Sequence, residues 1–287
     1  PCGTLFPYTT LFRSGCSFGY HYRNIHVGCH THDTPLDLRR GVQNSCNSYF
    51  CNVFRQIMED PEYENSEAAF NSWRKHVTSF GFGSKLGTDF TNELAGNVPT
   101  SDYYDSYYRS GHWNFLTIIS LAIGQGELLI TPLQMANMTA AIANKGHYYI
   151  PHVIKEIEGR DMIDFTYIEP HQTTIDSSHF DPIIDGMELA VNGGEGSTAR
   201  IARMRDITIC GKTGTAQNPH GEDHSIFIAF APKEDPKIAL AVYVENQGFG
   251  STWAAPIASL MIEQYLTGEV NRRWLEQYVL KGNTDKE

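Results

Sequence analysis

The chain has 287 residues, of which 41% are hydrophobic and 19% are charged, and its formal net charge is −11. This length and composition are those of a globular protein with a substantial core, folded as one large domain or two small ones. The negative net charge argues against a surface that binds nucleic acid or an anionic membrane. No run of eighteen or more apolar residues is present, so the sequence predicts no membrane-spanning helix within this stretch.

The first fourteen residues differ in character from the rest of the chain. Residues 4–14, with the sequence TLFPYTTLFRS, match one reading frame of a common DNA-sequencing adapter without a mismatch. We therefore interpret residues 1–14 as an assembly artefact and exclude them from fold reasoning, with an apolar β-hairpin as the alternative. On this interpretation the genuine protein begins near Gly15, and the segment upstream of it is lost.

The first half of the chain predicts helices joined by loops. Residues 15–48 are rich in Cys, His and Asn and predict a loop. An apolar stripe at helical spacing follows, formed by Phe50, Val53, Phe54, Ile57 and Met58. A second apolar stripe is formed by Phe70, Trp73, Val77 and Phe80. The helix that carries it is predicted to end at Gly81 and Gly83. Residues 84–130 predict a long polar and aromatic connection.

Clear capping signals mark two further helices. Thr131-Pro132-Leu133-Gln134 is a capping box with proline at the first helical position, and the helix it opens is predicted to stop at Gly146. Asp181-Pro182 opens another helix, which Gly193-Gly194 closes.

Strand signals dominate the last third of the chain. Residues 207–210 predict a short strand, and residues 225–231 and 237–244 predict two strands joined by a hairpin-like connection. A helix ending at Gly268 follows, and residues 271–287 form a polar C-terminal tail. Helices combined with an antiparallel hairpin late in the chain predict an α+β fold, with helices packed on an antiparallel sheet.

One motif indicates the type of reaction. Lys212-Thr213-Gly214-Thr215 directly follows the predicted strand 207–210, and a strand that delivers Lys-Thr-Gly to its edge is typical of serine acyl-transferases that act on penicillin. A phosphate-binding loop is excluded, because it needs a glycine five residues before Gly211 and Asp206 stands there.

A second motif, Ser45-Cys46-Asn47, lies just before the first amphipathic helix. Together the two motifs supply a hydroxyl, an amide, a cation and a hydrogen-bonding strand edge. Acyl transfer needs a proton relay, a positive field near the nucleophile and donors aimed at the developing oxyanion. The alternative for Ser45 and Asn47 is helix N-capping, which both residue types favour.

Residues 15–270 resemble the C-terminal part of the transpeptidase domain of the penicillin-binding protein 2 family, class B enzymes of cell elongation. Ordered blocks of sequence carry the resemblance: residues 35–38, 45–47, 96–100, 123–126, 131–135, 211–217, 230–232 and 244–246. It implies the penicillin-binding-protein and serine β-lactamase-like fold, incomplete at its N-terminus. It also implies D,D-transpeptidation, in which a serine attacks the D-Ala-D-Ala end of a peptidoglycan stem peptide and β-lactams mimic that end.

The resemblance also implies roles for individual residues. Ser45 would relay a proton, Asn47 would bind the substrate amide and the catalytic lysine, and Lys212 would polarise the site. The substrate would be contacted by Thr213, Gly214 and Thr215. The two threonine side chains would bind its carboxylate. The backbone N–H of Thr215 would line the oxyanion hole.

The family's third motif, the Ser-x-x-Lys that holds the nucleophile, is expected upstream of Ser45 and is absent there. Ser72-Trp73-Arg74-Lys75 is the one match in the sequence, and it lies downstream of Ser45. At about 100° per residue, Ser72 and Lys75 fall opposite the apolar stripe of their helix and should face solvent. We therefore expect this chain to form no acyl-enzyme. The lost segment would supply the central helix and part of the sheet, so we expect exposed apolar surface and marginal stability.

Residues 16–51 gather four cysteines and four histidines, and thiolate and imidazole ligands suit tetrahedral zinc. The resemblance implies that some relatives hold zinc beside the active site through a cysteine at the position of Cys46. The set that we predict is Cys16, Cys29, His32 and Cys46, with His30 as the substitute for His32. Disulfides and reduced thiols are the alternatives.

The resemblance further places the parent protein at the periplasmic face of the bacterial inner membrane, anchored by an upstream segment and partnered by an elongation-complex glycosyltransferase. Two other functions remain open: a β-lactamase or β-lactam sensor of the same fold, and a non-catalytic, zinc-stabilised interaction domain. The aromatics between residues 103 and 115 suggest a glycan-binding groove, with a packed connection as the default.

Overall fold

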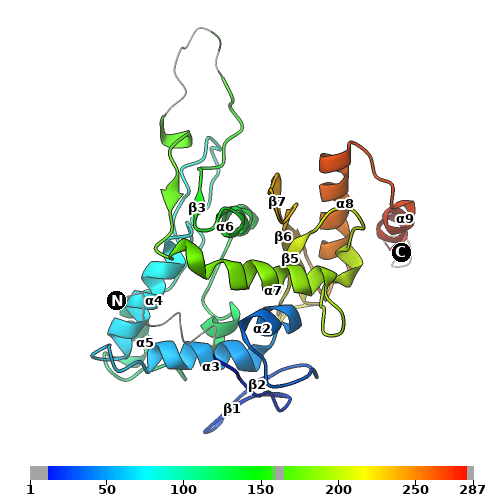
Figure 1. Ribbon diagram of the computed structural model, residues 1–287. Coiled ribbons are helices and arrows are strands. Elements are labelled where there is room, and N and C mark those ends of the chain that lie inside the picture. The colour runs from blue at the N-terminus through cyan, green and yellow to red at the C-terminus, as the bar shows by residue number, and fades with distance from the viewer. Residues whose placement is uncertain (1–11, 157, 159–164, 283–287) are drawn as a thin grey trace.

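The computed structural model describes residues 12–156, 158 and 165–282, and its centre is a three-stranded antiparallel sheet (Figure 1). β5 (Cys210–Ala216) pairs with β6 (His224–Ala231), and β6 pairs with β7 (Ile238–Val244). The predicted hairpin is therefore confirmed. Among the described residues β5 has a partner on one side only, which leaves its other edge open beside the first half of the chain.

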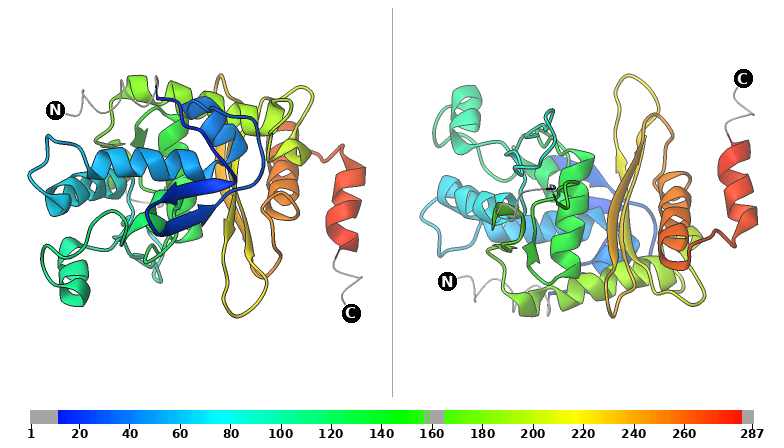
Figure 2. Two further views of the ribbon diagram at one scale, coloured as in Figure 1. Left: turned by 90° about the horizontal axis from the view of Figure 1, so that it is seen from below. Right: turned by 90° about the horizontal axis from the view of Figure 1, so that it is seen from above.

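Helices cover both faces of this sheet (Figure 2). α6 (Pro132–Ala143) and α7 (Asp181–Asn192) pack on one face, and α8 (Ala254–Thr267) packs on the other. The alternation of side chains along β6 explains this, because Phe227 and Ala229 join the α8 core while Phe230 joins the α6–α7 core. The predicted capping box at the start of α6 is confirmed.

The first half of the chain builds a second core. It contains α3 (Asn47–Met58), α4 (Ser66–Thr78), α5 (Ser101–Tyr108) and the 3-10 helix η1 (Ile119–Ile123). Their buried side chains form one aromatic-rich cluster, whose members include Phe54, Phe70, Tyr104, Trp113, Phe115 and Leu121. The two apolar stripes predicted for α3 and α4 supply Phe54, Met58, Phe70 and Trp73 to this cluster.

Two segments predicted as irregular contain regular structure. Residues 15–48 hold the hairpin β1 (Gly19–Tyr22) and β2 (Ile25–Gly28), followed by α2 (Leu38–Asn44), so the loop prediction is wrong. The side chain of Asp37 caps α2 by accepting from the backbone N–H of Arg40. The connection 84–130 likewise contains α5 and η1, because three of its aromatic residues, Tyr104, Trp113 and Phe115, are buried in a core.

The strand predicted over 207–210 is also wrong in its bounds. β5 begins at Cys210 and contains the whole Lys-Thr-Gly-Thr motif, because β6 is long enough to pair with it as far as Ala216. Residues 1–11 of the predicted artefact lie outside the described residues, whereas Ser14 exchanges two backbone hydrogen bonds with Leu36.

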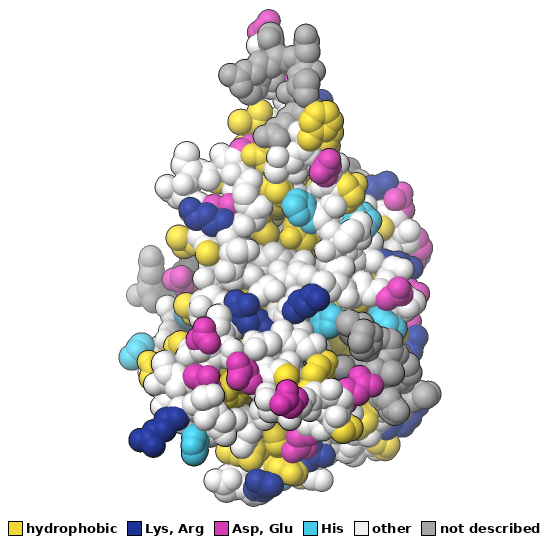
Figure 3. Space-filling model, turned by 90° about the vertical axis from the view of Figure 1, so that its left-hand side faces the viewer, with side chains coloured by type: hydrophobic (Ala, Val, Ile, Leu, Met, Phe, Trp, Pro, Cys, Tyr) yellow, Lys and Arg dark blue, Asp and Glu magenta, His cyan; other side chains and the backbone are white. Residues whose placement is uncertain are grey.

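An arm projects from the body between α6 and α7. It contains the strand pair β3 (His147–Tyr148) and β4 (His171–Gln172) and the 3-10 helices η2 (Phe165–Tyr167) and η3 (Ser177–His179). The arm stands at the top of the molecule (Figure 3), and the exposed apolar side chains among its described residues are Tyr149, Val153, Ile154, Phe165 and Ile168. A last 3-10 helix, η4 (Arg200–Ala202), precedes β5.

The C-terminal tail includes α9 (Arg273–Lys281), whose Leu275 is fully buried. Among the described helices, none combines the length and the apolar character needed to cross a membrane.

Candidate active site

The site begins at a break between two helices. α2 ends at Ser45, which adopts the left-handed conformation (φ 54°). α3 starts after Cys46, whose Sγ accepts from the backbone N–H of Tyr49 at 3.3 Å. Cys46 is therefore the N-cap, and the alternative in which Ser45 or Asn47 caps the helix is wrong. The Asn47 side chain instead donates to the carbonyl of Gly28 at 2.8 Å.

β5 brings the Lys-Thr-Gly motif to this break. The Nζ of Lys212 donates to Ser45 Oγ at 2.7 Å and to the carbonyl oxygen of Thr213 at 2.7 Å. Burial lowers the pKa of Lys212 to about 8, because the protein solvates the ammonium less well than water does. The lysine is thus a cation at neutral pH that a modest rise in pH can discharge.

A cavity of about 770 Å³ opens over these groups. Its lining includes all six residues expected to act in catalysis or substrate binding: Ser45, Asn47, Lys212, Thr213, Gly214 and Thr215. No carboxylate is among the described residues that line it, so the charge of Lys212 meets no acidic side chain from this part of the chain. A cation flanked by hydroxyls and by a strand edge can hold a carboxylate and a peptide in extended form.

Sequence reasoning missed several residues that line this cavity. Four come from loops distant in sequence, Gln125, Thr198, Phe249 and Ser251, whereas His30 follows β2 and Phe50 lies on α3. Gln125 stands between Gly124 and Gly126, both in the left-handed region (φ 74° and 78°). The glycine pair signalled a turn in the sequence, but nothing in the sequence placed that turn beside Lys212.

Ser72 and Lys75 lie on α4 and do not line the cavity. Lys75 is exposed, as the helical spacing predicts. Ser72 is half-buried and its hydroxyl lies 2.9 Å from that of Tyr63, so its predicted exposure to solvent is wrong. The residues after Asp60 turn back and place Tyr63 over this face of α4.

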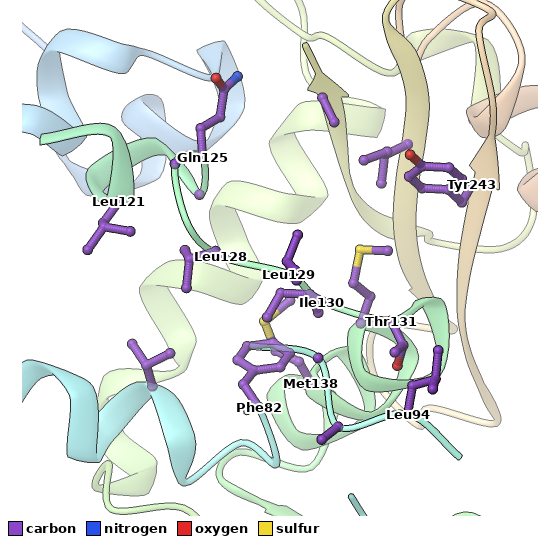
Figure 4. Close-up of a pocket in the computed structure, with 18 of the residues that line it drawn as sticks. Phe82, Leu94, Leu121, Gln125, Leu128, Leu129, Ile130, Thr131, Met138 and Tyr243 are labelled. Atoms are coloured by element: carbon purple, nitrogen blue, oxygen red, sulfur yellow. The ribbon is translucent and has the colours of Figure 1, made fainter. Parts of the chain in front are cut away.

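A larger apolar cavity of about 930 Å³ adjoins the first, and Gly124 and Gln125 line both (Figure 4). Apolar side chains from three parts of the fold enclose it, among them Trp73, Leu121, Leu129, Met138, Ile226 and Tyr243. In Figure 4, Phe82, Leu129, Ile130 and Met138 gather around it, while Gln125 points away from them.

The four residues predicted as zinc ligands converge beside the site. The ligand atoms of Cys16, Cys29, His32 and Cys46 all lie within 4.8 Å of one another. Ligands bound to zinc at about 2.3 Å in a tetrahedron lie about 3.8 Å apart, so a contraction of about an ångström completes the site. Three sulfurs and one imidazole nitrogen form a common donor set for structural zinc, and the residues therefore fit the metal.

Contacts around this cluster support the same use. His32 Nδ1 bonds to the carbonyl oxygen of Asp33 at 2.8 Å, which turns its Nε2 toward Cys29 at 3.6 Å. The hydrogen bond between Cys29 and Cys46 holds the pKa of Cys29 far below its usual range and raises the pKa of Cys46. The thiolate form, which a metal needs, is thus already favoured at Cys29. Each cysteine in the described part of the chain carries a free thiol, so the disulfide alternative is not found there.

Comparison with known proteins identifies the class. The family model of the penicillin binding protein transpeptidase domain matches residues 3–263, and the chain belongs to this family. The fold agrees: the structure of Pseudomonas aeruginosa PBP2 superposes with a TM-score of 0.77 at 28% identity, over 96% of this chain and 59% of that one.

The similar sequences are of the PBP2 type. The peptidoglycan D,D-transpeptidase MrdA of Haemophilus influenzae is 31% identical over 247 residues, which cover 80% of this chain and 36% of that protein. MrdA of Acinetobacter baumannii is 30% identical over the same share of this chain and 34% of its own length. The chain thus spans about a third of the length of these curated relatives.

Proposed function

We propose that this chain carries the Lys-Thr-Gly and Ser-x-Asn part of a peptidoglycan D,D-transpeptidase site, which binds the D-Ala-D-Ala end of a stem peptide and β-lactams. The observation that carries the proposal is the 2.7 Å contact between Lys212 Nζ and Ser45 Oγ inside a cavity without carboxylates. Lys212 attracts the substrate carboxylate, and the hydroxyls of Thr213 and Thr215 complete its binding. Ser45 is placed to pass a proton between Lys212 and the leaving amine.

The nucleophile itself lies outside the chain in this proposal. Acyl transfer requires a serine hydroxyl near the oxyanion donors, and the cavity offers the hydroxyls of Ser45, Thr198, Thr213, Thr215 and Ser251 without a Ser-x-x-Lys pair. We place the missing helix of the parent protein in the adjoining 930 Å³ cavity, since its walls are apolar and Gly124 and Gln125 line both spaces. Such a helix would present its serine to Lys212.

Zinc has a supporting part in this proposal. When bound, the ion would tie the segments on either side of the β1–β2 hairpin to the start of α3 through Cys16, Cys29, His32 and Cys46. Cys46 stands between Ser45 and Asn47, so the ligands would fix the loop that positions both side chains. The zinc-stabilised interaction domain remains the second candidate, and the same four converging ligands are the observation that favours it.

The parent protein would act at the periplasmic face of the inner membrane, held by an upstream anchor and working with the elongation glycosyltransferase. The similarity to MrdA proteins supports this placement.

The test uses the purified chain and a fluorescent penicillin. We expect reversible binding, seen as a rise in fluorescence anisotropy, with no covalent adduct by intact-mass analysis. Circular dichroism establishes that the protein is folded. Folded protein that shows no reversible binding contradicts the proposed site. An adduct mapped to Ser72 contradicts the assignment of the nucleophile to another segment.

A further inference from the structure

Three exposed tyrosines form a platform on α5 that the proposed reaction does not use. Tyr103, Tyr107 and Tyr108 are 38%, 70% and 47% exposed. The ring centroids of Tyr103 and Tyr107 lie 5.0 Å apart, and those of Tyr107 and Tyr108 lie 6.5 Å apart. α5 lies beside α4, at the end of the molecule away from the three-stranded sheet (Figures 1 and 2). We name these three side chains the tyrosine platform.

The platform is held rigidly from beneath. Tyr104, on the inner face of α5, is buried among Phe70 and Trp113, with ring centroids 5.5 and 5.3 Å away. Trp113 Nε1 donates to the carboxylate of Asp105 at 2.7 Å. The side chain of Thr100 caps the helix by accepting from the backbone N–H of Tyr103. A fixed backbone lowers the entropy lost when the exposed rings bind a ligand.

The composition of this face argues for a carbohydrate. The exposed side chains of α5 are tyrosine, aspartate and serine, without an aliphatic residue. A flat ring with a hydroxyl at its tip suits the C–H face and the hydroxyl rim of a sugar. A stable protein partner buries roughly 800 Å² on each side. Three tyrosines offer much less than that area, but one or two rings cover a sugar.

The platform is also connected to the cavity that holds Lys212. Tyr104 Oη donates to the carboxylate of Glu127 at 2.9 Å, and Glu127 is two residues from Gln125 in the cavity wall. An extended pentapeptide spans about 17 Å. A stem peptide that enters the cavity can therefore leave its glycan strand up to about 17 Å away, and α5 is joined to the cavity wall through the hydrogen bond between Tyr104 and Glu127.

We infer that the tyrosine platform binds the glycan strand of the substrate, as a subsite for β-1,4-linked N-acetylated sugars. The inference rests on the proposed function for the identity of the polymer. It assigns the platform a ligand that the Lys212 cavity does not hold, so each can be measured without the other.

The experiment titrates the full chain with chitotetraose, a peptide-free N-acetylglucosamine tetramer, and measures affinity by saturation-transfer NMR. We expect Tyr103→Ala/Tyr107→Ala to weaken binding about fivefold or more, from roughly 1 kcal/mol of lost ring contact. Tyr107→Phe, which keeps the ring, should retain most of the affinity. Tyr265→Ala, an equally exposed tyrosine on α8, is the matched control and should change nothing.

Lys212→Gln separates the two proposals. It should weaken binding of the fluorescent penicillin about tenfold or more and leave chitotetraose binding intact. Equal chitotetraose affinities in the wild type and in the double variant, or no binding of chitotetraose at all, overturn the platform. If Lys212→Gln loses penicillin binding but still binds chitotetraose, the tyrosine platform remains supported.

Discussion

The ammonium nitrogen of Lys212 lies 2.7 Å from the hydroxyl oxygen of Ser45, although 167 positions separate the two residues in sequence. One residue ends α2 and the other lies on an edge strand, so the contact joins the two halves of the molecule. It also gives the serine hydroxyl a positively charged neighbour. The predictions about ligand binding follow from this pair.

Replacing Lys212 by glutamine should weaken the affinity for the fluorescent penicillin by about tenfold or more. The reason is the loss of a charge-assisted hydrogen bond to the ligand carboxylate, which contributes about 1.5–3 kcal/mol. Fluorescence anisotropy measures the change. Lys75→Gln is the matched control, because Lys75 is exposed on α4 and outside the cavity. Equal losses in both variants would show that long-range charge, rather than this contact, governs binding.

Binding of the same ligand should depend on pH around 8. Because burial lowers the pKa of Lys212 to about 8, its ammonium is present below that pH and is lost above it. Penicillin affinity should be constant between pH 6 and 7 and should fall towards tenfold per unit above pH 8. The effect on stability has the opposite sign. Between about pH 8 and 10.5 the unfolded chain holds the extra proton, so raising the pH through this window favours the folded state at this residue.

Lys212→Arg gives the control for this pH dependence. Arginine stays charged throughout the range, so the affinity of the variant should show no inflection near pH 8. An inflection that persists in the arginine variant would assign the pH dependence to another group.

The sequence predicted the late elements of the fold well, because their signals are local. The capping box at Thr131, the proline after Asp181 and the β-branched runs of β6 and β7 each determine their own conformation. The first 48 residues were predicted less well. Their hairpin and α2 are stabilised by contacts with distant elements, for example the close packing of α2 against α7. No local pattern records such contacts.

The candidate site was likewise predicted only in part. The motifs at Ser45 and Lys212 and the four converging Cys and His residues predicted to bind zinc could be identified from residue type and order along the chain. The remaining walls of the cavity, at Gln125, Thr198 and Phe249, come from loops whose positions depend on the assembled fold. The half-burial of Ser72 also escaped prediction, because it depends on Tyr63 in a turn rather than on helical spacing.

Cys46→Ser should abolish stoichiometric zinc binding. It removes one of three thiolates, and zinc in Cys₃His sites depends on all four ligands. Elemental analysis of the dialysed protein gives the metal content, and we expect about one zinc per chain in the wild type. Cys51→Ala is the matched control, since Cys51 is buried in α3 but lies outside the cluster, and it should keep its zinc. A wild-type protein without zinc after refolding in excess metal would refute the site.

The apolar cavity beside the site should bind a hydrophobic dye. Its volume of about 930 Å³ and its apolar walls can hold an anilinonaphthalene sulfonate molecule in the folded state. Met138→Trp places a larger side chain into this space and should lower dye fluorescence at least twofold. Met261→Trp, at an exposed position on α8, is the control. Dye binding that both variants leave unchanged would place the dye elsewhere.

Gln134 should contribute more to stability than any other single polar side chain of α6. Its Nε2 donates toward the carbonyl oxygens of Gly81, Ser84 and Ala95 at 3.1, 2.9 and 2.9 Å, and its Oε1 accepts from the backbone N–H of Thr131. The side chain is 1% exposed, so its loss leaves several buried backbone groups without partners. Gln134→Leu keeps the volume and should lower the free energy of unfolding by about 2–4 kcal/mol. Urea denaturation measures this, with Gln217→Leu at an exposed site as the control. A loss below about 1 kcal/mol would mean that water replaces these bonds, and that α6 is positioned by its apolar contacts with the sheet alone.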